Sequence, residues 1–493
     1  MSKLYESTRN KMETITPSKA ILQGLSTDGG LFVLRDLKEQ KIDVNSLVEK
    51  DYYGIAQEIL KLFVDDFSDE EIKNCVYHAY QDKFTNEEIT PLVELSDAYV
   101  LELFNGPTSA FKDVGLSMLP QLTSTALKKT NADYDILILT ATSGDTGKAA
   151  LEGFKDVPKT KIMVFYPNEG VSKVQEMQMK TQEGKNLKVC AINGNFDDAQ
   201  SGIKKLFVDE DFKAELAKDH VRLSSANSIN IGRLVPQIVY YFYAYVKLVE
   251  KGAIKVGEEI NFVVPTGNFG NILAGYYAKQ IGLPIHKLVC ASNDNNVLYD
   301  FINTGTYDRK RSFLKTISPS MDILISSNLE RLLYYASDCD NEYISELMND
   351  LNTNGSYKVK ADVLQKIQAD FSCGFASNQQ TAETIKKVYE KDKYLLDPHT
   401  AVAYKVLLDE IDVEHKNVVL STASPYKFTD SVYGALHGEN GEDEFVLMEK
   451  LYEETNVAIP TNLKDLDKKP ILHKDLIKKE NMKEYIKEKV KEI

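Results

Sequence analysis

The sequence is poor in the patterns that mark several common classes of protein. Its five cysteines lie far apart and include no CxxC pair: Cys75, Cys190, Cys290, Cys339 and Cys373. Thiols scattered in this way argue against metal or redox use and fit a reducing cytoplasm. The seven histidines never occur in HEXXH or another metal-ligand spacing, so the sequence predicts no metal site.

Long apolar runs are also missing. The most apolar helical stretch, residues 234–247, contains Gln237 and is too short to span a bilayer, so we expect a buried helix and no membrane partner. Residues 1–12 contain no apolar core, which predicts that no secretory signal is present. A formal net charge of -15 argues against a nucleic-acid partner, because such binding depends on clustered lysine and arginine. It still permits a small anionic substrate, since a local cluster of donors can oppose the overall field.

What the sequence does contain is a long alternation of short β-rich runs and helical segments. With 493 residues, 43% of them apolar and 27% charged, the chain is expected to be a globular protein of two or three domains. After about residue 95, runs such as DILILT, KIMVFY, NFVVP and VVLST are separated by longer segments with helical periodicity. This pattern predicts an α/β fold built from βαβ units, with parallel sheets covered by helices.

Changes in composition and periodicity along the sequence divide the chain into four regions with approximate boundaries. Residues 1–95 are expected to be mostly helical, and residues 441–493 to form a charged, solvated helical extension, because they end in KKENMKEYIKEKVKEI. Between them we expect a smaller α/β domain at residues 96–225 and a larger one at residues 226–440, and the alternative that part of residues 96–225 belongs to the larger domain stays open.

Two glycine-rich turns follow β-rich runs. DILILT leads into ATSGDTGKAALEGF, and NFVVP leads into TGNFGNILAGYYAK. At such junctions the backbone N–H groups and the helix dipole point toward an anion. Neither turn matches GxxxxGK[ST] or GxGxxG, so an NTPase or a dinucleotide enzyme is disfavoured. A phosphate cradle and an ordinary turn both remain open for each.

A third motif, FNGPTSAFKDVG, places Lys112 among small and aromatic residues at the start of an expected helix. Desolvation there would lower the pKa of the amine and raise its nucleophilicity, as Schiff-base chemistry requires. A lysine whose ammonium group reaches the solvent is the alternative that this motif alone leaves open.

Taken together and in this order, GPTSAFKD, TATSGDTG and VPTGNFGN resemble the threonine synthases, which are fold-type II pyridoxal-phosphate enzymes. LQGLSTDGGLFV, SSANSINIGRL, SPSMDILISSNLERLL, DPHTAVAY and STASPYKF are similar to that family as well. The resemblance extends from about residue 5 to about residue 435 and favours the microbial and fungal branch. It implies a tryptophan synthase β-like fold, with two parallel-sheet α/β domains and a helical N-terminal region.

The resemblance implies a role for individual residues of these motifs. Lys112 is the catalytic lysine that joins pyridoxal 5'-phosphate, with Phe111 beside it and Asp145 facing a cofactor oxygen, since Asp145 would repel a substrate carboxylate. Thr422 matches the residue that bonds the pyridine nitrogen, and a neutral hydroxyl there gives a milder electron sink than an aspartate. The expected phosphate cradle of the cofactor is Gly267, Asn268, Phe269, Gly270 and Asn271. The expected substrate-binding residues are Ser143, Thr146, Asn227, Ser228 and Arg233.

The activity implied by the resemblance is conversion of O-phospho-L-homoserine and water to L-threonine and phosphate. Arg233 offers a planar, two-pronged donor that suits the substrate phosphate. A dehydratase acting on serine or threonine is the nearest alternative, and it would have no substrate phosphate to hold; a non-catalytic relative is a more distant one. Two departures from the family pattern, Asn105 and Ser424 where histidine is common, are expected near the cofactor.

Overall fold

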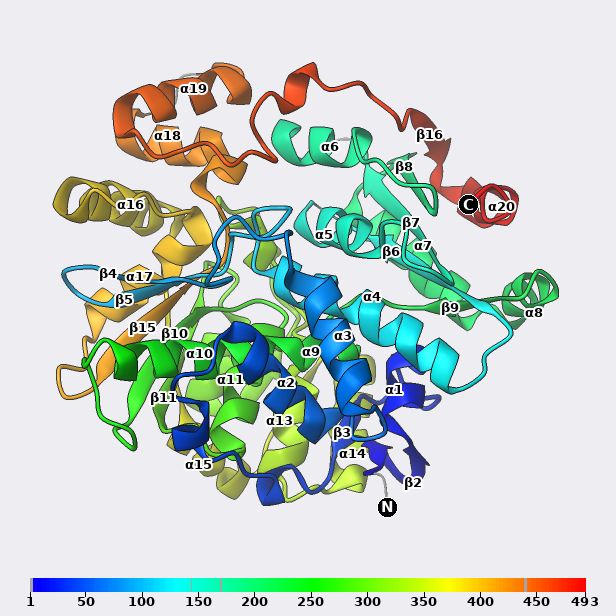
Figure 1. Ribbon diagram of the computed structural model, residues 1–493, viewed down its shortest axis with the longest axis horizontal. Coiled ribbons are helices and arrows are strands. Elements are labelled where there is room, and N and C mark those ends of the chain that lie inside the picture. Colours follow the sequence, from blue (N-terminus) through cyan, green and yellow to red (C-terminus); the bar gives the residue numbers. More distant parts are fainter. Residues whose placement is uncertain (1–2, 143, 169–170, 439–440) are drawn as a thin grey trace.

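The computed structural model describes residues 3–142, 144–168, 171–438 and 441–493, and two sheets of mainly parallel strands dominate it (Figure 1). The larger sheet has the strand order β14-β11-β10-β15-β5-β4, and all neighbours are parallel except β4 and β5. Its strands are β4 (Leu92–Glu94), β5 (Tyr99–Glu102), β10 (Ile260–Pro265), β11 (Ile285–Ser292), β14 (Phe371–Phe375) and β15 (Lys416–Ser421).

The smaller sheet is entirely parallel, with the order β16-β8-β7-β6-β9. Its strands are β6 (Asp135–Ala141), β7 (Thr160–Pro167), β8 (Leu187–Asn193), β9 (Val221–Ser224) and β16 (Asp475–Lys478). The central strands are apolar on both faces, because helices cover both sides of a parallel sheet. The helices of this half are α5 (Asp145–Phe154), α6 (Lys173–Lys180), α7 (Phe196–Val208), α8 (Glu210–Lys218) and α20 (Met482–Lys489).

The N-terminal region contains a small antiparallel sheet besides its helices. The sheet comprises β1 (Tyr5–Ser7), β2 (Asn10–Ile15) and β3 (Phe32–Leu34). The helices are α1 (Pro17–Gln23), α2 (Tyr52–Phe63) and α3 (Asp69–Tyr80), with 3-10 turns η1 (Leu37–Glu39) and η2 (Val44–Leu47). Helix α2 packs on α10 (Pro236–Glu250), whose side chains are almost all buried. This confirms the buried helix expected at residues 234–247, and none of the helices in the described residues is long and apolar enough to cross a membrane.

The remaining elements cover the larger sheet and connect it to the rest of the molecule. Its helices are α4 (Lys112–Lys129), α9 (Ile231–Leu234), α11 (Gly270–Gln280), α12 (Val297–Thr304), α13 (Leu329–Ala336), α14 (Asn341–Asn354), α15 (Ala361–Asp370), α16 (Asn378–Asp392), α17 (Pro398–Asp409), α18 (Thr429–His437) and α19 (Glu444–Thr455). A hairpin of β12 (Thr306–Asp308) and β13 (Ser356–Lys358) and the turns η3 (Pro319–Met321), η4 (Pro425–Phe428), η5 (Leu466–Lys468) and η6 (Lys479–Asn481) complete the described structure.

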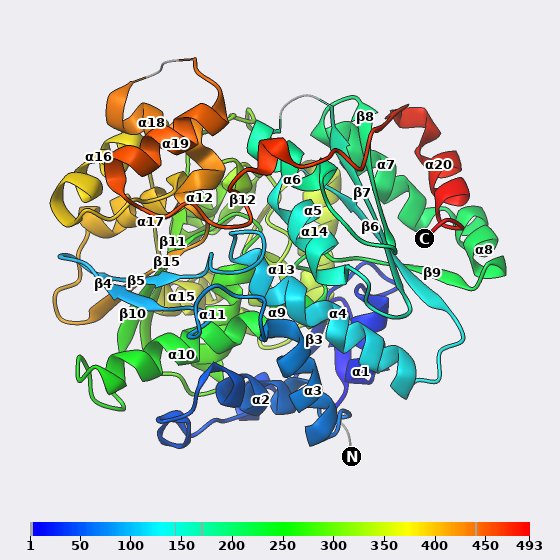
Figure 2. The same ribbon diagram turned by 45° about the horizontal axis from the view of Figure 1, so that its top comes forward.

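The sheet topology differs from the expected division of the chain in two places. Strand β5 falls in the region assigned to the smaller domain, yet it pairs with β15 in the larger sheet. The C-terminal segment crosses to the smaller sheet, where β16 pairs with β8 (Figure 2). Met482, Ile486 and Val490 are buried in the core of that sheet. The expectation of a solvated tail was therefore wrong, because apolar residues at helical spacing turn one face of α20 inward while its lysines and glutamates face water.

Candidate active site

A cavity with a volume of about 1930 Å³ opens where strands of both sheets end. Residues that follow β6 and β9 of the smaller sheet line one side, and residues that follow β10 and β15 of the larger sheet line the other. Ligands of open parallel sheets bind in the crevice outside the carboxyl ends of the strands. The fold thus brings the three motifs of the sequence to one place.

The turn at residues 267–271 joins β10 to α11 and lines the cavity. Phe269 has a φ of 62°, and no side chain caps the N-terminus of α11. A Cβ atom on Gly267 would lie 2.9 Å from the carbonyl oxygen of Ser320, so the turn leaves no room there for a larger residue. The ring of Phe269 packs against Phe371 in the core, which leaves only its backbone to the cavity. These free N–H groups at a helix start fit a phosphate group.

Lys112 is the first residue of α4, and the cavity reaches its side chain. The backbone N–H of Phe111 donates to the carbonyl oxygen of Thr422 at 2.8 Å, which holds the start of α4 beside the end of β15. The Nζ of Lys112 donates to Ser320 Oγ at 3.3 Å and lies 3.7 Å from Asp145 Oδ2. Burial lowers the pKa of Lys112 to about 8, although Asp145 acts in the opposite direction. The desolvated lysine that the motif suggested is therefore present.

Asp145 starts α5 and is the centre of a buried charge cluster. Its Oδ1 is 2.8 Å from the Nζ of Lys427 and accepts a hydrogen bond from Gln175 Nε2, also at 2.8 Å. Burial by itself raises the pKa of Asp145, but the ammonium groups of Lys427 and Lys112 outweigh it and hold this pKa well below its usual range. Lys427 is fully buried and also donates to the carbonyl oxygen of Thr108 at 2.8 Å. Asp145 is thus a carboxylate aimed at the Lys112 amine.

Ser320 is held in place by a buried histidine. The backbone N–H of Ser320 donates to His399 Nε2 at 3.0 Å, while Nδ1 of His399 lies 2.8 Å from Asp397 Oδ1. Because Nε2 accepts a hydrogen bond, the ring proton lies on Nδ1 and points to Asp397. These hydrogen bonds from Asp397 through His399 position Ser320, whose hydroxyl contacts both Lys112 and Asp145.

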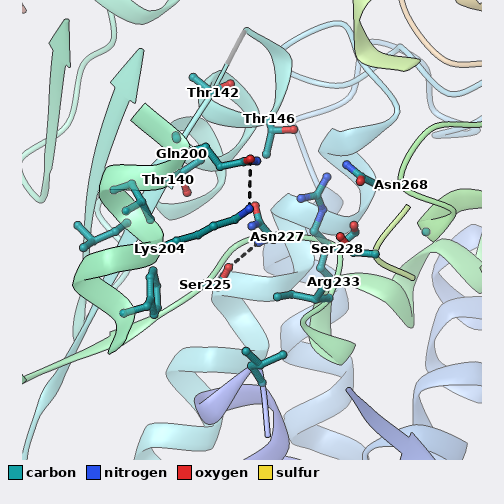
Figure 3. A pocket seen from close by; sticks show the side chains of 18 of the residues that line it. Thr140, Thr142, Thr146, Gln200, Lys204, Ser225, Asn227, Ser228, Arg233 and Asn268 are labelled. Carbon is teal, nitrogen blue, oxygen red and sulfur yellow. Dashed lines mark hydrogen bonds between the residues drawn. The ribbon is translucent and has the colours of Figure 1, made fainter. Parts of the chain in front are cut away.

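The residues expected to bind substrate phosphate surround the same cavity, and Figure 3 shows the guanidinium group of Arg233 pointing into it. Asn328 Nδ2 donates to Ser228 Oγ at 2.8 Å, and Arg233 donates to the carbonyl oxygen of Ala226 at 2.7 Å. The Nε of Arg233 is buried and has no hydrogen-bond partner among the described residues. Burial lowers the pKa of Arg233 to about 10, so it stays charged at neutral pH.

The other expected residues are placed as follows. Asn227, Thr146 and Asn268 line the cavity, and so does Thr422, which follows β15. Asn271 also lines it; its Oδ1 accepts a hydrogen bond from Tyr241 at 3.1 Å, and its Nδ2 has no partner among the described residues. Ser143 lies outside the described residues.

The two departures from the family pattern do not line the cavity in the described structure. Asn105 Nδ2 donates weakly to the carbonyl oxygen of Glu102 at 3.4 Å. Ser424 caps η4 by accepting a hydrogen bond from the backbone N–H of Tyr426 at 3.3 Å. Neither side chain is therefore placed to contact a ligand in the cavity directly.

Sequence reasoning missed Ser320, His399 and Lys427. Each falls in a motif that carries the resemblance, namely SPSMDILISSNLERLL, DPHTAVAY and STASPYKF. The signal that could have found them was their position within these motifs. Nothing in the local sequence, however, indicates that three such distant segments meet at Lys112.

The residues present fit pyridoxal phosphate. Lys112 provides a desolvated amine for an aldehyde, and the uncapped start of α11 provides N–H groups for a phosphate. Thr422 provides a hydroxyl for a ring nitrogen on the wall of the same cavity. All three groups lie at strand ends or helix starts, which are rigid parts of the fold.

Comparison with known proteins identifies the family. The sequence matches the family profiles described as "Threonine synthase N terminus" at residues 4–80, "Pyridoxal-phosphate dependent enzyme" at residues 84–423 and "Threonine synthase, C-terminal" at residues 400–486. It is 37% identical to threonine synthase of Saccharomyces cerevisiae over 470 residues, which is 89% of this chain and 90% of that protein. It is also 37% identical to threonine synthase of Pseudomonas aeruginosa, over 88% of this chain and 91% of that protein.

The fold leads to the same family. The crystal structure of pyridoxal-phosphate-bound threonine synthase from Brucella melitensis superposes with a TM-score of 0.88 at 36% identity, covering 99% of each chain. The expected fold-type II architecture is confirmed. The chain belongs to the threonine synthase family of pyridoxal-phosphate-dependent enzymes.

Proposed function

We propose that the chain converts O-phospho-L-homoserine and water to L-threonine and phosphate in this cavity. The observation that supports this reaction most directly is that one cavity offers two places for an anion. The uncapped start of α11 suits the cofactor phosphate, and the unpartnered Nε of buried Arg233 suits a second phosphate, that of the substrate.

When bound, pyridoxal phosphate supplies an aldehyde that joins the substrate amine and a ring that withdraws electrons from the substrate Cα. Lys112 is the base in this proposal. With a pKa of about 8, a useful fraction of its amine is neutral near pH 7 and can accept the Cα proton. Ser320 and Asp145 orient the amine through the contacts at 3.3 and 3.7 Å.

Arg233, Asn227 and Ser228 hold the substrate phosphate. Arg233 stabilises the negative charge that collects on this group as the bond to Cγ breaks, because a buried guanidinium is not screened by water. Loss of a second proton, from Cβ, supplies the electron pair that expels phosphate from Cγ, and Cγ then takes up a proton. Water adds its hydroxyl group at Cβ, and a proton returns to Cα.

A dehydratase is the alternative that an assay must separate. Purified holoenzyme is incubated with O-phospho-L-homoserine, with L-serine or with L-threonine, and free phosphate, threonine and 2-oxo acid are measured. We expect phosphate and threonine in equal amounts from the first substrate. Formation of 2-oxo acid from serine or threonine, without phosphate release from O-phospho-L-homoserine, would contradict the proposal.

A lysine variant tests the assigned base. Lys112→Ala should lose roughly 10³-fold or more in kcat, since it removes both the base and the covalent attachment point. Lys128→Ala, at an exposed position of the same helix, is the matched control and should keep wild-type activity. Peptide mapping after borohydride reduction should find the cofactor on Lys112; an adduct on another lysine would contradict the assignment.

We infer that the enzyme works in the reducing cytoplasm. In the structure Cys75, Cys190 and Cys290 are buried, and none of the five cysteines forms a disulfide. Free thiols at all five positions are compatible with a reducing compartment.

A further inference from the structure

The cavity carries a charge opposite to that of the protein. Seven cationic side chains line it, against three carboxylates, in a chain of net charge -15. The cations are Lys19, Lys112, Lys204, Lys213, Lys315, Arg222 and Arg233, and the carboxylates are Asp145, Glu210 and Asp322. A cleft lined by one sign of charge concentrates ligands of the other sign, even when the whole molecule repels them.

Lys204 is a cation of this cavity that neither catalysis nor the expected phosphate site uses. It lies on α7, and its Nζ donates to Gln200 Oε1 at 3.3 Å, one helical turn earlier. No carboxylate pairs with Lys204 among the described residues, whereas Lys213 of α8 is 2.9 Å from Glu210. Figure 3 shows the Lys204 side chain extending from α7 into the cavity, on the side of Asn227.

Two further donors face the same part of the cavity. Thr140, near the end of β6, is 2% exposed, and its hydroxyl has no hydrogen-bond partner among the described residues. A buried hydroxyl without a partner is costly unless a ligand satisfies it. The oxygen of Gln200 accepts from Lys204, and the N–H groups of its amide, which have no acceptor among the described residues, can donate to a ligand. Figure 3 shows Thr140, Gln200 and Lys204 together on the wall formed by β6 and α7.

We propose that Lys204, Gln200 and Thr140 form a second phosphate subsite, which takes up the dianionic phosphate monoester before it reaches Arg233. The identity of that monoester as O-phospho-L-homoserine rests on the proposed function. The subsite is on the smaller sheet, whereas the cofactor cradle is on the larger one. A substrate first held on the smaller sheet enters with its phosphate leading toward Asn227 and its amino group free to reach Lys112.

Kinetics of charge-neutral variants test this subsite. Lys204→Gln should lower kcat/KM about 5- to 10-fold through KM, with kcat almost unchanged, and the difference from wild type should shrink in about 0.5 M salt. Lys205→Gln is the matched control, because Lys205 is the next residue of α7 and is exposed like Lys204 but, unlike Lys204, is not among the residues that line the cavity. It makes the same change in net charge and should leave KM unchanged. Equal effects of the two variants, or none from Lys204→Gln, would overturn the proposal.

Inorganic phosphate is the direct probe, measured by calorimetry on the holoenzyme. Lys204→Gln and Thr140→Val should each weaken phosphate binding about 3-fold or more, while Lys205→Gln binds as the wild type does. Thr140→Val should not lower Tm, because it removes a hydroxyl that has no partner. Unchanged phosphate binding in both variants would overturn the subsite. This titration decides the question even if the wild type releases no phosphate from O-phospho-L-homoserine, the result that would defeat the proposed function alone.

Discussion

Two clusters of charged side chains share the cavity and differ in how completely they are paired. At Lys112 the charges satisfy one another, since Asp145 contacts Lys112, Lys427 and Gln175. Around Arg233 the donors exceed the acceptors, because Arg233 Nε, Thr140 Oγ1 and the ammonium group of Lys204 have no anionic partner among the described residues. The first arrangement fixes a side chain for chemistry, whereas the second leaves donors for an anion that arrives later. Donors without an anionic partner, of which Arg233 and Thr140 are buried and Lys204 is exposed, therefore indicate a ligand site better than charge density does.

The largest expected effect on kcat/KM comes from a substitution of Arg233. Arg233→Gln removes the charge from the unpaired cluster and should lower kcat/KM about 10²-fold or more, because a buried charge pair with the substrate phosphate is lost. Cofactor absorbance should remain, since the substitution leaves the contacts of Lys112 with Ser320 and Asp145 in place. Stopped assays for phosphate release and an absorbance spectrum check both expectations. Loss of the bound cofactor in this variant would show that the two clusters are not separate.

Lys427→Met removes one cation from the paired cluster around Asp145. It leaves the buried Asp145 carboxylate without its closest cation and should lower the free energy of unfolding by about 3 kcal/mol. Without Lys427 burial dominates and raises the pKa of Asp145, so a proton can neutralise it, and the loss of stability should be smaller at pH 5 than at pH 8. Thermal unfolding at both pH values measures this.

The double variant Lys427→Met/Asp145→Asn is the matched control for that measurement. It should recover part of the lost stability, because the unpaired charge is gone. A Lys427→Met variant as stable as the wild type at pH 8 would mean that the ion pair contributes nothing.

The reactivity of the Lys112 amine should depend on pH in a way that reports its buried environment. In the cofactor-free protein its reaction with an amine-selective reagent should rise tenfold per pH unit and level off near pH 8, because only the neutral amine reacts. Asp145→Asn should move this midpoint down by about one unit, since Asp145 raises the Lys112 pKa. Mass spectrometry of the labelled peptide gives the midpoint. A midpoint near that of an ordinary lysine would contradict the buried environment.

The smallest expected effect comes from the departures from the family pattern. Ser424→His and Asn105→His should each change kcat/KM by less than about twofold, because neither residue lines the cavity. Steady-state kinetics of the two variants check this against the expectation that both positions lie near the cofactor.

The local parts of the site could be predicted from the sequence. The strand–glycine–helix turn at residues 267–271 and the position of Lys112 at a helix start follow from short-range patterns, and the family resemblance gave their roles. The parallel sheets could be predicted as well, because short apolar runs alternate with segments that have helical periodicity. The C-terminal segment was misjudged, since its lysine and glutamate content hid the apolar residues that pack on the smaller sheet.

Contacts between distant segments could not be predicted from short-range sequence patterns. The sequence spacing predicted no metal site, yet the fold brings the ligand atoms of Glu259, His286 and His415 within 4.8 Å of one another. The two imidazole rings stack with an interplanar angle of 4°, so their in-plane lone pairs do not converge on one point. We therefore assign no metal to this cluster.

The α/β class and the family could be recognised from the sequence, and it also predicts the reactive lysine and the phosphate turn, because each depends on residues that are neighbours along the chain. Only the tertiary structure decided which charges meet in the cavity. Asp145 pairs with Lys427, whereas Lys204, which lines the same cavity as Thr140, has no carboxylate partner in the part of the chain that the structure describes. The physical reason is that a side chain's burial and partners depend on how the two sheets pack, and local periodicity carries no information about that packing.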